Sequence, residues 1–138
     1  MNKAKTGSFF IIHLTGNNLY PKGHEKVTRK IKIPNVKKLS GFEKVIGLMF
    51  SSRKKAKTLL FEFEKPVRIS FTSLFVFFPF MIIWLDSKNK VLDFRKVNPF
   101  EFHIPSINPF CRVLEVPFND NYKKIINQFV ERKHLKRI

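Results

Sequence analysis

A stretch without charge, residues 69–85 (ISFTSLFVFFPFMIIWL), constrains the fold more than any other feature of the chain. No Asp, Glu, Lys or Arg lies between Arg68 and Asp86. A membrane-spanning helix needs about 20 mostly apolar residues, and Ser, Thr and Pro interrupt this shorter run. Phe, Val, Ile and Trp favour strands. We therefore interpret 68–78 and 80–85 as two buried core strands and predict no transmembrane segment.

Further short strands are expected on both sides of this centre. The pattern of residues 27–33 and 58–64 alternates between apolar and polar positions, as in a half-buried strand. Turn residues and prolines separate the other candidates, so a sandwich or small barrel is expected. The remaining expected strands are 8–14, 91–97, 100–104 and 110–116.

Two segments have helical spacing instead. Apolar residues recur every three or four positions in 34–50, although Gly41 and Gly47 oppose a helix there. In 119–138, Asn119 or Asp120 can cap an amphipathic helix with a basic end. We predict three parts: an N-terminal extension with a short strand (1–26), a β domain (27–118) and a basic C-terminal helix or tail (119–138).

The positive charge is large and unevenly distributed. The net charge is +17 and the isoelectric point is about 10.3. Residues 1–40 carry +8, and 41–68 carry +4, whereas 69–118 carry only +1 and 119–138 carry +4. A nearly neutral centre is thus flanked by basic arms, and an excess of this size indicates an anionic partner.

Several motifs, in order along residues 43–117, resemble an uncharacterised family. Its helical R-G-L-M element corresponds to IGLM (46–49), and the following strand to LLFEF (59–63). SFTSLFV (70–76) and PFMIIWLD (79–86) resemble its central strand pair, in the form of archaeal members. PFEFHIP (99–105) and RVLEVP (112–117) resemble its later strands. The chain is therefore similar to a moderately diverged, archaeal-type member of domain-of-unknown-function family 192, also called uncharacterised protein family 0127.

The resemblance implies a compact, mainly antiparallel, jelly-roll-like β fold with one short helix. It also exposes three departures. Ile46 replaces the family's Arg, Thr72 replaces its His, and Met81 replaces its Asp. Any chemistry that these polar groups support in the family is not expected here, so the family fold serves as a scaffold with added positive charge.

Catalytic and metal-binding motifs are not found. The four histidines (13, 24, 103 and 134) are not at ligand spacing, and Cys111 lacks a neighbouring Cys or His. No G-x-S-x-G, P-loop or dinucleotide-binding motif occurs. Glu62 and Glu64 are expected to be solvated or paired with Lys, Asp86 to serve its turn, and Glu115 to be a buried anchor or an ion-pair partner. We predict no enzyme activity, cofactor or metal.

The distribution of cations predicts RNA binding. Lys and Arg attract phosphates and release counterions, and no major-groove-reading motif is present. Scattered cations around a β core suit a folded RNA, so we expect contacts with ribosomal RNA and neighbouring ribosomal proteins in the cytoplasm, without DNA sequence specificity. The candidate residues are Arg29, Lys30 and Lys32 on a strand, Lys37 and Lys38 on a helix, Arg53, Lys54, Lys55 and Lys57 on a loop, and Arg132, Lys133, Lys136 and Arg137 at the end of the chain.

Two alternatives stay open. The basic C-terminal helix could lie on an anionic membrane surface, or the β domain could retain a small-ligand or enzymatic role of the family. Chromosome binding is a variant of the RNA hypothesis. The many Phe residues are expected to form the core rather than to stack on bases.

Overall fold

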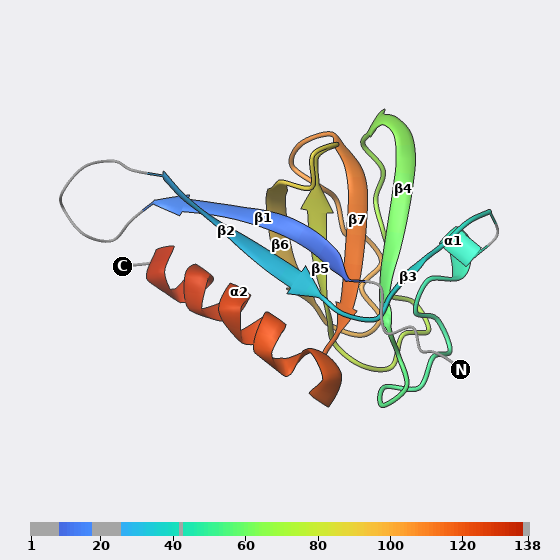
Figure 1. The fold of residues 1–138 in the computed structure, drawn as a ribbon. Coiled ribbons are helices and arrows are strands. Elements are labelled where there is room, and N and C mark those ends of the chain that lie inside the picture. Colours follow the sequence, from blue (N-terminus) through green and yellow to red (C-terminus); the bar gives the residue numbers. More distant parts are fainter. Residues whose placement is uncertain (1–8, 18–25, 42, 137–138) are drawn as a thin grey trace, which may run out of the picture.

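The computed structural model describes residues 9–17, 26–41 and 43–136, and it is mainly β, as the sequence predicts (Figure 1). Seven strands form two sheets that do not close into a barrel. The elements, in chain order, are β1 (Phe10–Asn17), β2 (Lys26–Ile33), β3 (Val36–Lys38), α1 (Glu43–Ile46), β4 (Thr58–Val67), β5 (Phe80–Leu85), β6 (Val91–Val97), β7 (Phe110–Pro117), the 3-10 turn η1 (Asp120–Tyr122) and α2 (Lys123–Lys136).

The larger sheet has five strands in the order β3-β4-β7-β5-β6. Strand β7 is central and pairs antiparallel with both β4 and β5. The short β3 is the exception to the expected antiparallel arrangement, because it pairs parallel with β4. Strand β5 is buried along its whole length, which explains why its sequence shows no polar alternation.

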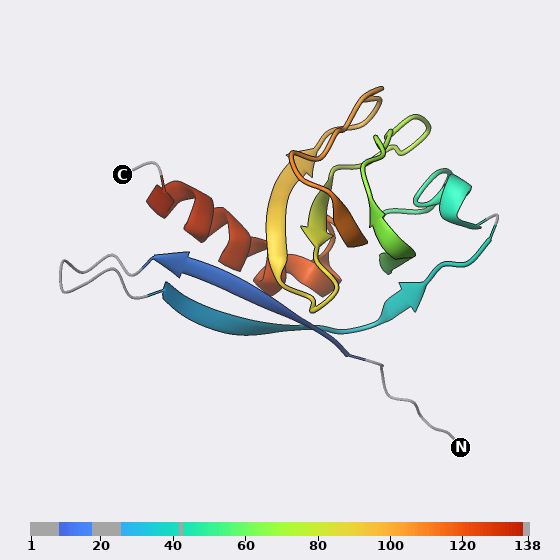
Figure 2. The same ribbon diagram turned by 90° about the horizontal axis from the view of Figure 1, so that it is seen from above.

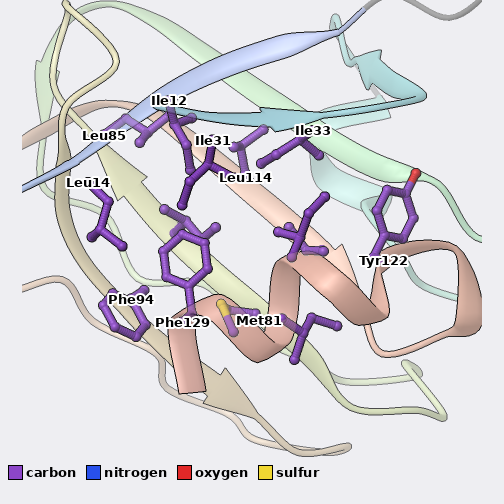
Figure 3. Close-up of a cluster of buried hydrophobic side chains, with 14 of the residues drawn as sticks. Ile12, Leu14, Ile31, Ile33, Met81, Leu85, Phe94, Leu114, Tyr122 and Phe129 are labelled. Carbon is purple, nitrogen blue, oxygen red and sulfur yellow. The ribbon is translucent and has the colours of Figure 1, made fainter. Parts of the chain in front are cut away.

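One face of this sheet is covered by regular secondary structure (Figures 1 and 2). The antiparallel β1–β2 hairpin contributes Ile12 and Ile31 to this core, and α2 contributes Ile125 and Phe129. The Phe129 ring meets the Phe94 ring of β6 edge-on at 4.8 Å between centroids. Figure 3 shows these apolar side chains converging between helix, hairpin and sheet. The 3.6-residue periodicity of 122–129 thus places one helix face in the core.

Irregular segments cover the opposite face. Alternate residues of β5, Phe80, Ile82 and Trp84, point to this side, where they pack with Phe61 and Val113. Buried residues of the segments around them complete the second core; these are Leu39, Leu48, Ala56, Val76, Phe78 and Ile104. The two cores lie on opposite sides of one sheet, so each central strand is buried on both faces.

Three elements predicted from the sequence are wrong: the helix over 34–50 and the strands over 68–78 and 100–104. Residues 34–50 form β3, the four-residue α1 and turns, because Asn35, Gly41 and Gly47 adopt φ of 52°, 55° and 53°, outside the helical region. Segment 68–78 is not a strand. It touches segment 100–104, likewise not a strand, through an isolated bridge between Phe71 and Ile104.

Two expectations for the centre of the chain, the strand over 80–85 and the turn at Asp86, are confirmed. Strand β5 matches the expected strand 80–85, and Asp86 shapes the following turn by accepting hydrogen bonds from the Lys88 and Lys90 amides at 2.8 and 2.9 Å. In the described part of the chain, no helix is both long and apolar enough to cross a membrane.

Candidate functional site

The basic loop 51–57 is exposed and held in place by the start of the C-terminal region. Arg53 donates a hydrogen bond through Nε to the Phe118 carbonyl at 2.7 Å. The Asn119 side-chain amide donates to the carbonyls of Arg53 and Ala56 at 2.8 and 3.0 Å. Ala56 itself is buried and anchors the loop in the core. These contacts fix the backbone from which the loop cations extend.

Tyr122 holds the residue that directly follows this loop. Its hydroxyl donates to the Asn35 carbonyl at 3.0 Å and accepts from the Thr58 amide at 2.9 Å. The tyrosine therefore joins the β2–β3 connection to the first residue of β4, directly after the loop. Tyr122 and Thr58 are both buried, so the tyrosine hydroxyl satisfies a backbone amide that water does not reach.

Hollows lie on both sides of the loop, and cations line each of them. One, of about 470 Å³, is lined by Lys37, Lys55 and Lys57 together with Ser51 and Ser52, and by no acidic residue among those that the structure describes. The other, of about 710 Å³, is lined by the remaining loop cations, Arg53 and Lys54, and by the first turns of the C-terminal region, where Lys123 faces Asp120 at 3.8 Å. The structure thus gathers six cations and one acid around one loop.

Exposed aromatic rings adjoin this basic loop. Phe50, the residue before it, is 71% exposed, and its ring stacks on that of Phe75 with centroids 5.3 Å apart. The Phe50 amide donates to the Phe75 carbonyl at 3.0 Å. Both residues have φ of 60°, a conformation that is costly for bulky side chains. The fold therefore holds these rings at the surface at a cost.

A second pair of rings lies on the neighbouring segments. Phe77 and Phe100 meet edge-on with centroids 5.6 Å apart, and Phe102 is 76% exposed. Ser73 ties these segments together, because its hydroxyl donates to the Asn98 carbonyl and accepts from the Glu101 amide, both at 2.7 Å. The expectation that Phe residues form the core is wrong for these positions. Phe50, Phe75 and Phe100 have a positive φ. No sequence signal indicates this conformation at a Phe, so the exposure of these rings could not be predicted.

Lys37 lines one of the two hollows beside the loop, and none of the other described cations predicted outside the loop lines either of them. Arg29, Lys30 and Lys32 are exposed on the β1–β2 hairpin, whose inner side packs on the larger sheet (Figure 2). Lys37 and Lys38 lie on strand β3, not on a helix as expected. Arg132, Lys133 and Lys136 belong to α2, but their side chains lie outside the described residues, as does all of Arg137.

Lys38 forms an ion pair with the carboxylate of Glu62. Its Nζ lies 2.6 Å from Glu62 Oε1, while Arg112 Nε donates to Glu62 Oε2 at 2.9 Å. The hydrogen bond from Lys38, and then that from Arg112, lowers the pKa of Glu62. The expectation that Glu62 is paired with a nearby Lys is confirmed, and this ion pair makes Lys38 less suited to contact a phosphate.

Glu115 is the one buried carboxyl group among the described residues. It lies on β7, opposite Leu59 of β4 and Ile82 of β5, on the face covered by irregular segments. Burial raises the pKa of Glu115 to about 8. Neither a hydrogen bond nor an ion pair to this carboxyl group is found among the described residues, so the ion-pair alternative is wrong within them.

Comparison with known proteins identifies the family. Residues 28–125 match domain-of-unknown-function family DUF192, described as an uncharacterized ACR. The chain belongs to DUF192. The match confirms the resemblance read from the motifs and extends it to both sides, into β2 and the first turn of α2. No curated protein matches the chain.

Two solved structures share the DUF192 chain's fold. A protein from Sinorhizobium meliloti 1021, described as a candidate transcription regulator, has a TM-score of 0.55 and 17% identity over 89% of this chain and 90% of its own. A protein of unknown function from Novosphingobium aromaticivorans DSM 12444 has a TM-score of 0.52 and 17% identity over 80% of this chain and 85% of its own. At this identity the similarity concerns the fold alone.

Proposed function

We propose that this DUF192 protein binds structured RNA through loop 51–57 and the aromatic rings beside it. The observation that carries the proposal is the set of six cations around one anchored loop, where Asp120 is the single acid among the described lining residues. Each hollow beside the loop offers lysine ammonium groups to a phosphate, and counterion release from the RNA would favour their contact. Ribosomal RNA in the cytoplasm is the target we favour.

The aromatic rings support RNA with unpaired bases. Phe50 precedes the loop directly, and its exposed ring can stack on a base that is not paired. Such stacking contributes roughly 1–3 kcal/mol per base and depends little on base identity. Cations for the phosphates and a ring for the bases therefore lie within a few residues of one another, as binding to loops or bulges of a folded RNA requires.

The C-terminal helix does not support the membrane alternative. A helix that lies on a membrane buries its apolar face among the lipids. In α2 that face, with Ile125, Ile126 and Phe129, is already buried against the sheet (Figure 3). The hairpin cations Arg29, Lys30 and Lys32 instead extend the proposed RNA surface along a second arm.

A pair of variants with equal net charge tests the proposal. Lys54→Gln, Lys55→Gln and Lys57→Gln together remove three loop cations. The control, Lys65→Gln, Lys88→Gln and Lys90→Gln, removes three exposed cations at the opposite ends of β4 and β5. We expect the loop variant to lower the slope of log affinity against log salt by roughly 2, at about 0.7–0.9 per lost contact. The control should change the slope by less than half as much.

The measurement is the binding of a hairpin RNA with an unpaired loop, followed by fluorescence anisotropy at several salt concentrations. Equal slopes for both variants would mean that RNA senses only the total charge, and the assignment to loop 51–57 would be wrong. A wild-type protein that binds no RNA at low salt would refute RNA binding altogether.

A further inference from the structure

A small cavity lies over Glu115, apart from the basic hollows. Its volume is about 200 Å³, below the size of sites for drug-like ligands. Its walls come from the turn after α1, from β4 and from segment 69–76. The lining includes Lys44, Gly47, Phe61, Phe71, Thr72 and Glu115.

The carboxyl group of Glu115 lies in the cavity wall next to the backbone of Gly47. A Cβ atom added there would lie 3.2 Å from Glu115 Oε1 and 3.5 Å from the Phe61 ring. The residue also adopts a φ of 53°, which a side chain would strain. Glycine therefore keeps the space directly beside the carboxyl oxygen open.

Lys44 and Thr72, two of the polar residues that line the cavity beside Ser70, have partners elsewhere. Lys44 Nζ donates to the Glu62 carbonyl at 2.8 Å and lies over the Phe63 ring. The Thr72 hydroxyl donates to the Glu101 carbonyl at 3.0 Å. The rest of the wall is largely apolar and aromatic. The buried Glu115 carboxyl group, 4% exposed, thus faces a cavity in which Lys44 is the one cation among the described lining residues, and the Lys44 ammonium group is directed to the Glu62 carbonyl and the Phe63 ring instead.

We propose that this cavity binds the ammonium or guanidinium group of a small organic cation, with the Glu115 carboxylate as its counter-ion and the Phe61 and Phe71 rings around its short apolar stem. Aromatic faces attract cations as well. A metal ion fits less well, because no group of three His, Cys, Asp or Glu side chains that could hold one occurs in the described part of the chain. An anion would face a carboxylate.

The departure from the family pattern agrees with this proposal. Ile46 stands where the family motif has an arginine, immediately before Gly47, and its side chain is 39% exposed. The chain therefore provides no guanidinium group at this position of the cavity wall. A guanidinium or ammonium group from a ligand would supply the charge that the sequence lacks.

Binding must release a proton below the pKa of the free carboxyl group. The O–H bond of the neutral Glu115 carboxyl group breaks, its proton goes to the buffer, and the carboxylate that remains accepts hydrogen bonds from the cation. Since burial raises the pKa of Glu115 to about 8, affinity should increase about tenfold per pH unit below that value and level off above it.

The experiment titrates the full chain with propylguanidinium and propylammonium, and with butanamide as a neutral probe of similar size. The chemical shift of the Glu115 carboxyl carbon reports binding from about pH 6 to about pH 9, across the expected pKa. We expect cations to bind with the pH dependence given above and butanamide to bind without it. Glu115→Gln should lose cation binding, whereas Glu62→Gln, which removes a partly buried carboxylate outside the cavity lining, should keep it.

Three outcomes would overturn the proposal: no shift with either cation at its solubility limit, affinity independent of pH, or unchanged affinity in Glu115→Gln. The circular dichroism spectrum shows whether each variant is folded. Gly47→Ala provides a second test, because the added methyl group narrows the cavity beside the carboxyl oxygen while Glu115 remains. It should weaken cation binding, and equal affinity would also contradict the proposal.

Discussion

The two faces of the five-stranded sheet differ in what covers them. The hairpin and α2 cover one face, whose core is apolar apart from the hydroxyl groups of Tyr122 and of Thr58, which lies on the same face of β4 as Leu60. Irregular segments cover the other face, where Glu115 and Ser73 are buried, Phe rings are exposed, and Phe50, Phe75 and Phe100 have positive φ. Strain and buried polar groups collect at functional sites. The comparison indicates that the first face stabilises the fold and that the second carries the functional features.

The largest difference between the faces should appear in stability. Phe129→Ala removes a ring that is fully buried between α2 and β6. We expect the free energy of unfolding to fall by about 3–5 kcal/mol, through lost burial and a new cavity. Phe102→Ala, on the irregular side, removes an exposed ring and should change it by less than about 0.5 kcal/mol. Urea denaturation measures the free energy of unfolding of both variants. Similar losses in the two variants would show that the two faces do not differ in their contribution to stability.

Glu115 should make the stability of the irregular face depend on pH. The pKa is about 8 in the folded state against 4.5 for an ordinary Glu, so the folded state binds more protons between these values. Stability relative to Glu115→Gln should therefore fall as pH rises from about 4.5 to about 8, by at most roughly 1.4 kcal/mol per unit. Thermal unfolding across this range measures the difference, and parallel pH profiles would contradict the account.

Asn119 links the basic loop to the C-terminal region. Asn119→Ala loses two hydrogen bonds to loop carbonyls and a cap to the Asn121 amide. We expect about 1–2 kcal/mol of lost stability and weaker RNA binding, because the loop cations are no longer held in place. Asn108→Ala, an exposed change at a residue that lines neither hollow, is the matched control. RNA affinity equal to that of the wild type would show that anchoring is unimportant.

A substitution at Phe50 separates backbone strain from function. Phe50→Gly relieves a left-handed backbone conformation, which costs roughly 1–2 kcal/mol for a residue with a side chain, and removes a largely exposed ring. Stability should remain within about 1 kcal/mol of the wild type or rise slightly. RNA binding should weaken at the same time. Unchanged RNA affinity would mean that the exposed ring has no part in binding.

Much of the sheet could be predicted because its signals are local. Alternation in 27–33 and 58–64 and the apolar run 80–85 gave strands that match β2, β4 and β5. The helix expected over 34–50 failed because left-handed residues at 35, 41 and 47 turn the chain. Segment 68–78 has a strand's composition, yet tertiary hydrogen bonds of Ser73 hold it as loops.

The candidate site was predictable only in part. Loop 51–57 is evident from its charge, since local composition determines that it is exposed. Its anchoring by Asn119 joins residues more than sixty positions apart, which no local pattern encodes. The burial of Glu115 depends on the register of β7 between two partners, and therefore its environment could not be decided before the fold was known.

The most direct test of RNA binding uses the protein in its own cell. Native lysate is sedimented through a sucrose gradient, with and without ribonuclease, for the wild type and for the Lys54→Gln, Lys55→Gln, Lys57→Gln variant. We predict that the wild type sediments with a ribosomal subunit at high salt, that ribonuclease releases it, and that the variant dissociates at lower salt. A wild-type protein that stays at the top of the gradient at low salt, whatever the nuclease treatment, would contradict the account.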